Sequence, residues 1–120
     1  MDIFGFSETE WNCAKNEAHR ALVERAKVRD TMTYTELAGK IRTIQFEAHD
    51  LRLNHLIGQV SKEENTAGRG MLSVIVVHKT GDGQPGDGFF ELANQLGRNT
   101  SDKMQCWINE LNKVYACWSP

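Results

Sequence analysis

Residues 32–37, which read Met-Thr-Tyr-Thr-Glu-Leu, are the clearest helix start in the chain. Thr33 and Glu36 have the spacing of a capping box, in which the threonine hydroxyl and the glutamate carboxylate each accept a hydrogen bond from the other residue's backbone N–H. The apolar residues on either side of the box stand where a hydrophobic staple would. We therefore predict a short helix that begins here and ends at about Ile41.

The same start signal occurs earlier in the chain, at Ser7 and Glu10. An apolar stripe at helical spacing follows it and predicts a first helix over about residues 8–29. Asp50 can cap a third helix, because residues 53–60 place apolar side chains at the i, i+3, i+4 and i+7 positions of one buried face. Residues 61–70 are polar and bounded by glycine, so we expect the third helix to fray there into a loop, either at once or after a further turn through Glu64.

Residues 71–78 form the strongest predicted strand, because they are rich in β-branched residues and almost continuously apolar. Residues 79–88 contain four glycines and a proline, which predicts a loop. A compact helix over about residues 89–96 ends at Gly97, and Ser101 or Asp102 can cap a last helix. We expect one face of that last helix to pack on the core, with the apolar residues Met104, Trp107, Ile108, Leu111, Tyr115 and Trp118.

These elements predict an α+β fold, a small helix-rich domain with one strong central strand in a small sheet. The chain has 120 residues and a mass of 13.6 kDa. A chain of this length can bury one hydrophobic core and is too short for two. We therefore expect residues 1–120 to form a single domain.

Charge and composition narrow the possible partners. The net charge of −2 and the pI near 6.1 give no general attraction to nucleic acid or to an anionic membrane, so any contact with DNA must use a local patch. No apolar run is long enough to cross a bilayer, and the amino terminus lacks a signal-peptide pattern. We expect a cytoplasmic protein that has no membrane partner.

Metals and cofactors are also not expected. Cys13, Cys106 and Cys117 are odd in number and lack metal-type spacing, so we expect reduced structural thiols. The four histidines are dispersed along the chain. The scattered carboxylates show no recognisable catalytic spacing, and we find no enzyme signature.

The order of three helices, a strand and a glycine-rich excursion is compatible with a winged helix-turn-helix domain, whose third helix enters a DNA groove. Residues 33–38, Thr-Tyr-Thr-Glu-Leu-Ala, resemble the start of the second helix in the alkyltransferase-like DNA repair family. Residues 55–58 fall where that family has Arg-Ala-Val-Gly, and residues 72–77 fall where it has Pro-Cys-His-Arg-Val-Val. The resemblance covers about residues 32–77 and implies that Tyr34 helps to rotate a nucleotide out of the duplex.

The chain departs from this family at two functional positions. His55 stands in place of the arginine that replaces the extruded base, and Ser73 stands in place of the cysteine that accepts the alkyl group. A neutral hydroxyl is a much poorer nucleophile than a thiolate, and no histidine or glutamate is adjacent in sequence to activate it. Alkyl transfer is therefore not expected.

Two further groups of residues are candidates for binding. Gly86, Asp87 and Gly88 stand at a predicted helix start, where glycines let a backbone approach a ligand and the helix dipole favours an anion. A tight turn in which Asp87 caps the helix explains the same residues without a ligand. Arg52, Arg69 and Lys79, with Lys62, can form a basic edge around the third helix, although a solvated surface of mixed charge is the ordinary explanation.

Three hypotheses follow from these patterns. The leading one is a non-enzymatic winged-helix-like domain that binds duplex DNA through Tyr34, Arg52, His55, Arg69 and Lys79. The alternative is a protein-binding module such as an inhibitor or an immunity protein, for which an acidic chain without catalytic residues is natural. The third is an enzyme built around residues 86–88. The oligomeric state is not determined by the sequence.

Overall fold

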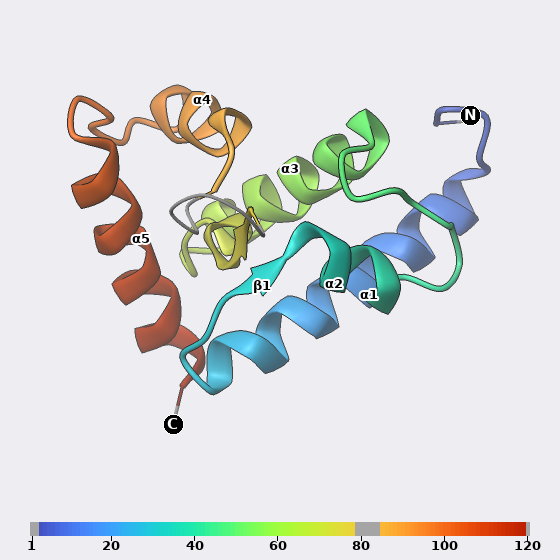
Figure 1. Ribbon diagram of the computed structural model, residues 1–120, viewed down its shortest axis with the longest axis horizontal. Helices are drawn as coiled ribbons and strands as arrows, with labels where there is room; N and C mark the ends of the chain where they lie inside the picture. The colour runs from blue at the N-terminus through green and yellow to red at the C-terminus, as the bar shows by residue number, and fades with distance from the viewer. Residues whose placement is uncertain (1–2, 79–84, 120) are drawn as a thin grey trace.

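The computed structural model describes residues 3–78 and 85–119 (Figure 1). Lys79 and most of the predicted glycine-rich loop lie outside these residues. The described part contains the helices α1 (Glu8–Lys27), α2 (Tyr34–Lys40), α3 (Leu51–Thr66), α4 (Asp87–Gln95) and α5 (Lys103–Trp118). It also contains a 3-10 helix, η1 (Leu72–Ile75), and two short strands, β1 (Met32–Thr33) and β2 (Val76–Val77). The α+β class is confirmed.

The predicted helix starts are confirmed by their caps. Both boxes form, since Ser7 and Thr33 accept the N–H of Glu10 and Glu36 at 3.1 Å. Asp50 caps α3 and Asp102 caps α5. The first helix ends two residues earlier than predicted, at Lys27.

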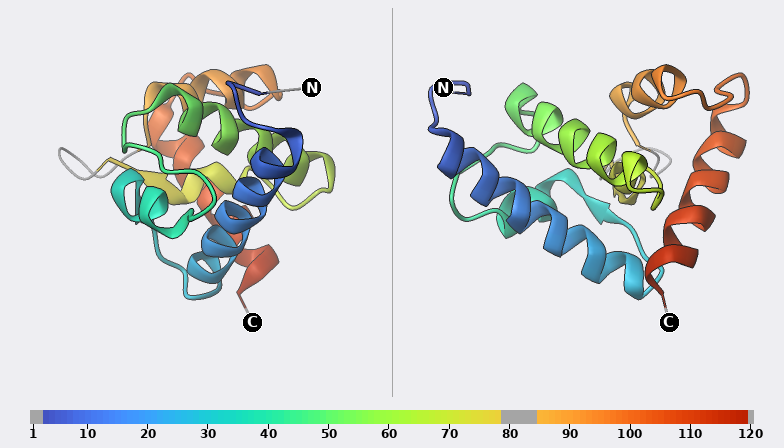
Figure 2. Two further views of the ribbon diagram at one scale, coloured as in Figure 1. Left: turned by 90° about the vertical axis from the view of Figure 1, so that its right-hand side faces the viewer. Right: turned by 180° about the vertical axis from the view of Figure 1, so that it is seen from behind.

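The elements enclose one core around η1. This short helix contacts α1, α3 and α5, and its four residues are all buried. β1 and β2 pair in parallel, with Met32 opposite Val76 and Thr33 opposite Val77. Figures 1 and 2 show that α5 lies at the end of the molecule opposite the amino terminus. Of the helices in the described ranges, none is long and apolar enough to cross a membrane.

The prediction of a strand over residues 71–78 was wrong for most of its length. Only Val76–Val77 is a strand, and Leu72–Ile75 is a 3-10 helix. A continuous apolar run indicates burial, but it does not separate a strand from a short buried helix. The 3-10 turn brings the N–H and hydroxyl of Ser73 to the hydroxyl of Ser61 on α3.

The expected loop at residues 61–70 was also partly wrong, because α3 continues to Thr66. Ser61 and Glu64 look like surface residues, yet both are buried. Glu64 binds Arg69 and His19, at 2.6 and 2.8 Å, so its charge is paired. Paired polar groups inside a fold cannot be distinguished from solvated ones by their residue type.

The inward face of α5 is shifted from the predicted one. Its buried residues are Cys106, Glu110 and Val114. Trp107 is only partly buried and donates its indole N–H to the Val74 carbonyl, while Ile108 remains 39% exposed. Four residues of the predicted stripe pack against the core, namely Trp107, Leu111, Tyr115 and Trp118, whereas Met104 and Ile108 are exposed. The prediction was therefore wrong in part, because Glu110 takes a core position.

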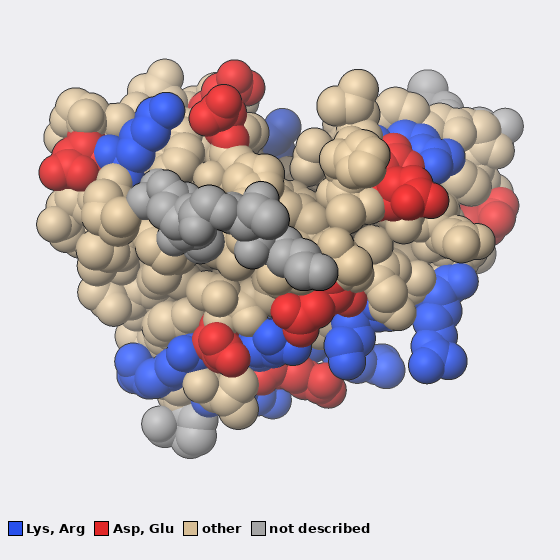
Figure 3. All heavy atoms as spheres, viewed as in Figure 1, with Lys and Arg blue, Asp and Glu red and all other residues tan. Residues whose placement is uncertain are grey.

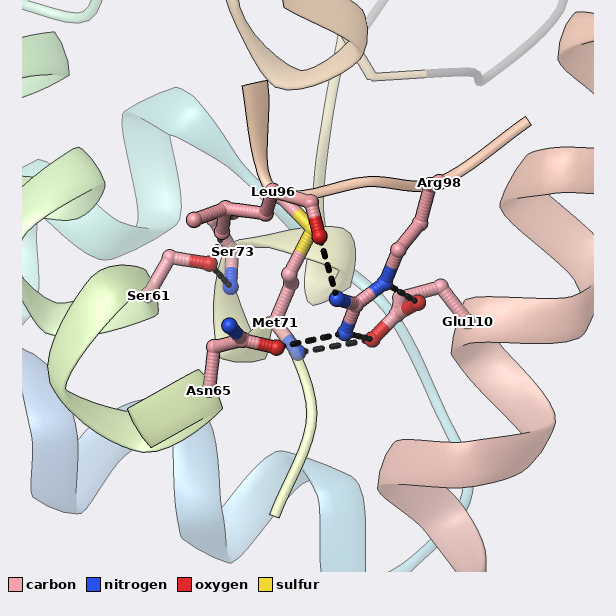
Figure 4. Close-up of polar contacts among 7 residues, drawn as sticks. All are labelled: Ser61, Asn65, Met71, Ser73, Leu96, Arg98 and Glu110. Carbon is pink, nitrogen blue, oxygen red and sulfur yellow. Dashed lines mark hydrogen bonds and ion pairs between the residues drawn. The ribbon is translucent and has the colours of Figure 1, made fainter. Parts of the chain in front are cut away.

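The buried carboxylate of Glu110 links α5 to the segments that contain Met71 and Arg98, and Arg98 extends this network to α3 (Figure 4). It accepts two hydrogen bonds from Arg98, at 3.0 and 3.1 Å, and one from the Met71 N–H at 2.8 Å. Arg98 also donates to the Asn65 side chain and to the Leu96 carbonyl. Burial alone raises the pKa of Glu110, but the bonds from Arg98 and Met71 hold the pKa below its ordinary value. The carboxylate is thus charged and fully engaged at neutral pH.

Replacement of this carboxylate should be costly. We expect Glu110→Gln to lower the free energy of unfolding by about 3–5 kcal/mol, because the Arg98 charge loses its partner in a buried site. Urea denaturation at pH 7 measures this loss. Glu63→Gln is the matched control, since that carboxylate is 63% exposed and its pair with Lys15 contributes about 1 kcal/mol or less.

The stability difference between these two variants should also depend on pH. The folded pKa of Glu110 lies below its ordinary value of 4.5, so its stabilisation is present above that pH and is lost as the pH falls through the folded pKa. The difference between wild type and Glu110→Gln should therefore shrink in acid. Equal losses for the two variants at pH 7 would contradict this assignment.

Candidate nucleic-acid interface

A cavity of about 520 Å³ opens between α2, α3 and the start of α4. Tyr34 and Thr35 line it from the first turn of α2, and α3 contributes Asn54, Ile57 and Gly58. The remaining described lining residues come from η1, from the end of β2, from the start of α4 and from the segment before α3; they are Ser73, His78, Gly86, Asp87, Gly88, Phe89, Ala48 and His49. Three predicted site residues, Gly86, Asp87 and Gly88, thus meet Tyr34 at one cavity.

Tyr34 is held on the cavity wall by two neighbours. Its ring lies 5.3 Å from the ring of His78, and its hydroxyl oxygen accepts the N–H of Gly86. Burial raises the pKa of Tyr34, and the bond from Gly86 opposes this. A Cβ atom at Gly86 would lie 3.1 Å from His78 Nε2 and 3.3 Å from the tyrosine hydroxyl. A glycine there lets the start of α4 approach Tyr34 closely.

Ser73 contributes a hydroxyl to the cavity, and this hydroxyl is bonded to another serine. Its residue is only 6% exposed, and its hydroxyl donates to Ser61 Oγ at 2.8 Å. Within residues 3–78 and 85–119, no histidine or carboxylate is recorded as a hydrogen-bond partner of Ser73. A neutral serine in this position is a poor nucleophile.

The start of α4 differs from the predicted capped turn. Gly86 is the N-cap and makes no side-chain cap bond, so the expectation that Asp87 caps the helix was wrong. Asp87 occupies the first helical position with a 92% exposed side chain, 3.9 Å from Lys103. Its charge opposes a bound anion at this helix start.

The solvent-facing side of α3 forms an exposed stripe beside the cavity. It is defined by Leu51, Asn54, His55, Gly58 and Lys62, which recur at helical spacing and are exposed or half-exposed. The stripe contains no carboxylate. Glu63 and Glu64 point to other sides of the helix, where they bind Lys15 and Arg69. We call this surface the α3 stripe.

The predicted basic edge is not assembled around this stripe. Arg52 lies in the first turn of α3, and Arg69 follows its last turn, so most of the length of this 16-residue helix, about 21 Å, separates them. The Arg69 guanidinium binds Glu64 and lies 5.6 Å from the centre of the Trp118 ring. Lys79 lies outside the described residues.

The guanidinium of Arg52 makes its contacts within the protein. Its guanidinium binds the Asp50 carboxylate through Nη2 at 2.6 Å and lies over the rings of Phe6 and Phe46, at 5.4 and 5.6 Å. His55, by contrast, is exposed on the stripe beside Phe4. Arg52 and Arg69, the two arginines predicted to contact DNA, are thus each paired with a carboxylate of the protein.

Figure 3 shows how charge is distributed on the face that carries the cavity. Lysines and arginines alternate with carboxylates along its lower edge, over α1 and α2, and charged residues are sparser among the described residues above that edge. Within the described residues, no three histidine, cysteine, aspartate or glutamate side chains are grouped so that they could hold a metal ion.

Sequence reasoning missed several cavity residues. Asn54 and Gly58 lie four positions apart on the polar side of α3, and that spacing was the available signal. His78 follows the apolar run, but its contact with Tyr34 depends on the parallel pairing of β1 with β2. Such a long-range contact has no local sequence signal.

Comparison of the chain with protein-family models, with curated proteins and with solved structures gives no match.

The Asp50–Arg52 contact makes a testable pH prediction. Hydrogen bonds from Arg52, opposed by partial burial, lower the pKa of Asp50 from 3.8 to about 2. Carboxyl-carbon NMR should find this value in the wild type and a value closer to 3.8 in Arg52→Ala. Because the folded pKa is depressed, the contact stabilises the fold above about pH 4, and the stabilisation is lost as the pH falls towards 2. An Asp50 pKa near 3.8 in the wild type would contradict the contact between Asp50 and Arg52.

Proposed function

We propose that this chain is a non-enzymatic, winged-helix-like domain that binds duplex DNA along the α3 stripe and receives a rotated nucleotide in the adjacent cavity. The observation that carries the proposal is the position of Tyr34. The residue that the family resemblance associates with nucleotide rotation lines the cavity, next to the predicted third helix. Such a protein would act in the cytoplasm, where it meets DNA.

The α3 stripe has properties that suit a groove-reading helix. Asn54 and His55 carry hydrogen-bonding groups that can reach base edges, and Lys62 can reach a phosphate. Gly58, at the middle of the stripe, has open space where a side chain would be, so a duplex can approach the backbone there. With one lysine on the stripe and a net charge of −2, the affinity should be moderate and should fall with salt.

The residues of the cavity suit the binding of a displaced base without a chemical reaction. The Ser73 hydroxyl bonds to Ser61, and nothing recorded in the described ranges would remove its proton. A domain of this kind would hold a displaced base and leave it unchanged. Recognition would then favour a damaged base, because extrusion costs least where pairing is already weak.

The alternative function, an inhibitor-like or immunity-like protein-binding module, is favoured by a different surface. Ile108 is 39% exposed on the outer side of α5, at the opposite end of the molecule from the amino terminus. Stoichiometric capture of one cellular protein, abolished by Ile108→Glu, would support this alternative over DNA binding.

A bulky residue at the centre of the α3 stripe should block the duplex. We expect Gly58→Leu to weaken binding to a short duplex with one alkylated base by about tenfold or more, since the side chain would stand between the helix backbone and the groove. Fluorescence anisotropy at about 50 mM salt measures the affinity.

Gly39→Leu is the control for this experiment. Gly39 is an exposed helical glycine of α2 that, like Gly58, has no neighbouring atom within 4 Å of an added Cβ, but it lies away from the cavity. Both leucines should leave the fold at least as stable, because glycine is unfavourable in a helix. Wild-type protein that binds neither intact nor alkylated duplex would refute the proposed function.

A further inference from the structure

A strained hairpin at the amino terminus holds an aromatic ring in solvent. The backbones of Ile3 and Phe6 exchange two hydrogen bonds, at 2.8 and 2.9 Å, around the turn residues Phe4 and Gly5. Both turn residues have positive φ, 52° and 84°. This is the pattern of a type I′ hairpin, in which asparagine or aspartate followed by glycine is the usual pair. A phenylalanine adopts that conformation unfavourably, so its presence needs another explanation.

The hairpin places the Phe4 ring against α3. The ring centre lies 5.3 Å from that of His55, edge to face, and 5.7 Å from that of Trp11. Trp11 is buried and donates its indole N–H to Gln59 at 2.7 Å, and the Gln59 amide lies 3.2 Å from His55 Nε2. Phe4 and His55 are therefore held in place, although 53% of Phe4 is exposed.

This aromatic pair stands next to a groove of about 330 Å³ between α1 and α3. Lys62 lines the groove two helical turns after His55, on the same side of α3, and no ion pair of Lys62 is recorded in the described part. Two carboxylates also line it, Glu63, which Lys15 pairs at 2.6 Å, and Glu8 in the first turn of α1. The groove thus holds the cation of Lys62, about 10 Å along α3 from His55, together with the carboxylates of Glu8 and Glu63.

We infer that Phe4 and His55 form a stacking platform for a nucleobase, on the edge of the α3 stripe that faces away from the cavity. Every base has a π-face that can stack on an aromatic ring, and a neighbouring lysine can contact the phosphate of the same strand. This role would account for a phenylalanine at an unfavourable turn position, because the turn projects its ring beside the α3 stripe. This inference rests on the proposed function.

The test separates the ring from the turn that carries it. Phe4→Asn creates the favoured Asn-Gly turn, so the hairpin should persist and the denaturation midpoint should not fall. Loss of one stacking contact should weaken duplex binding by about 5- to 100-fold. Phe4→Tyr is the matched control, because it keeps a flat ring at the same position, and it should bind within about twofold of wild type.

A fluorescent base gives an independent readout. 2-Aminopurine, placed in turn at the positions that flank the alkylated base, should change its emission on binding wild type and Phe4→Tyr at one of those positions. Phe4→Asn should not produce that change. Should Phe4→Asn fail to fold, Phe4→Leu decides, because it keeps apolar bulk without a ring and should show the same loss of binding and of signal.

The outcomes distinguish the two proposals. If wild type binds the duplex and the ring-free variants bind equally well with the same emission change, the platform is overturned and the proposed function stands. If wild type does not bind DNA, both are overturned. Loss of both affinity and emission change in a variant that melts normally supports the platform.

Discussion

The fold depends on one buried charge, the carboxylate of Glu110. It fixes the N–H of Met71, where the chain enters η1, and through Arg98 it holds the connection between α4 and α5 against the end of α3. An adjacent glycine makes this close approach possible: Gly70 has a φ of 90°, and a Cβ there would lie 3.1 Å from the carboxylate oxygen. Breaking a buried ion pair of this kind is costly, because it leaves a buried charge without its partner.

The position of η1 in turn determines the cavity. With Met71 fixed, the 3-10 turn brings Ser73 to Ser61, and β2 then pairs with β1 directly before Tyr34. That pairing brings His78, which follows β2, against the Tyr34 ring. The same network anchors the segment that leads out of α4, whose first turn closes the cavity from the other side. The shape of the cavity therefore depends on the few polar contacts that Glu110 and Arg98 make in the core.

Local signals predicted the local structure well. The side chains of Ser7, Thr33, Asp50 and Asp102 begin four helices as their capping patterns indicated. Prediction failed where a long-range polar contact decided the outcome, as in the strand expected before Val76 and in the inward face of α5 around Glu110. Similarly, the sequence identified Tyr34 and the glycines of residues 86–88 separately, while their meeting at one cavity follows from tertiary packing. Arg69 was expected on a surface shared with Arg52, but it follows the far end of α3, where its guanidinium binds Glu64.

Amide NMR on the uniformly labelled wild-type protein, with and without an alkylated duplex, tests the central claim most directly. Our account predicts shifts at Asn54, Gly58 and Ser73 and in the first turns of α2 and α4, with the outer side of α5 unchanged. Perturbation confined to α5 around Ile108, or no perturbation at a saturating duplex concentration, would contradict it.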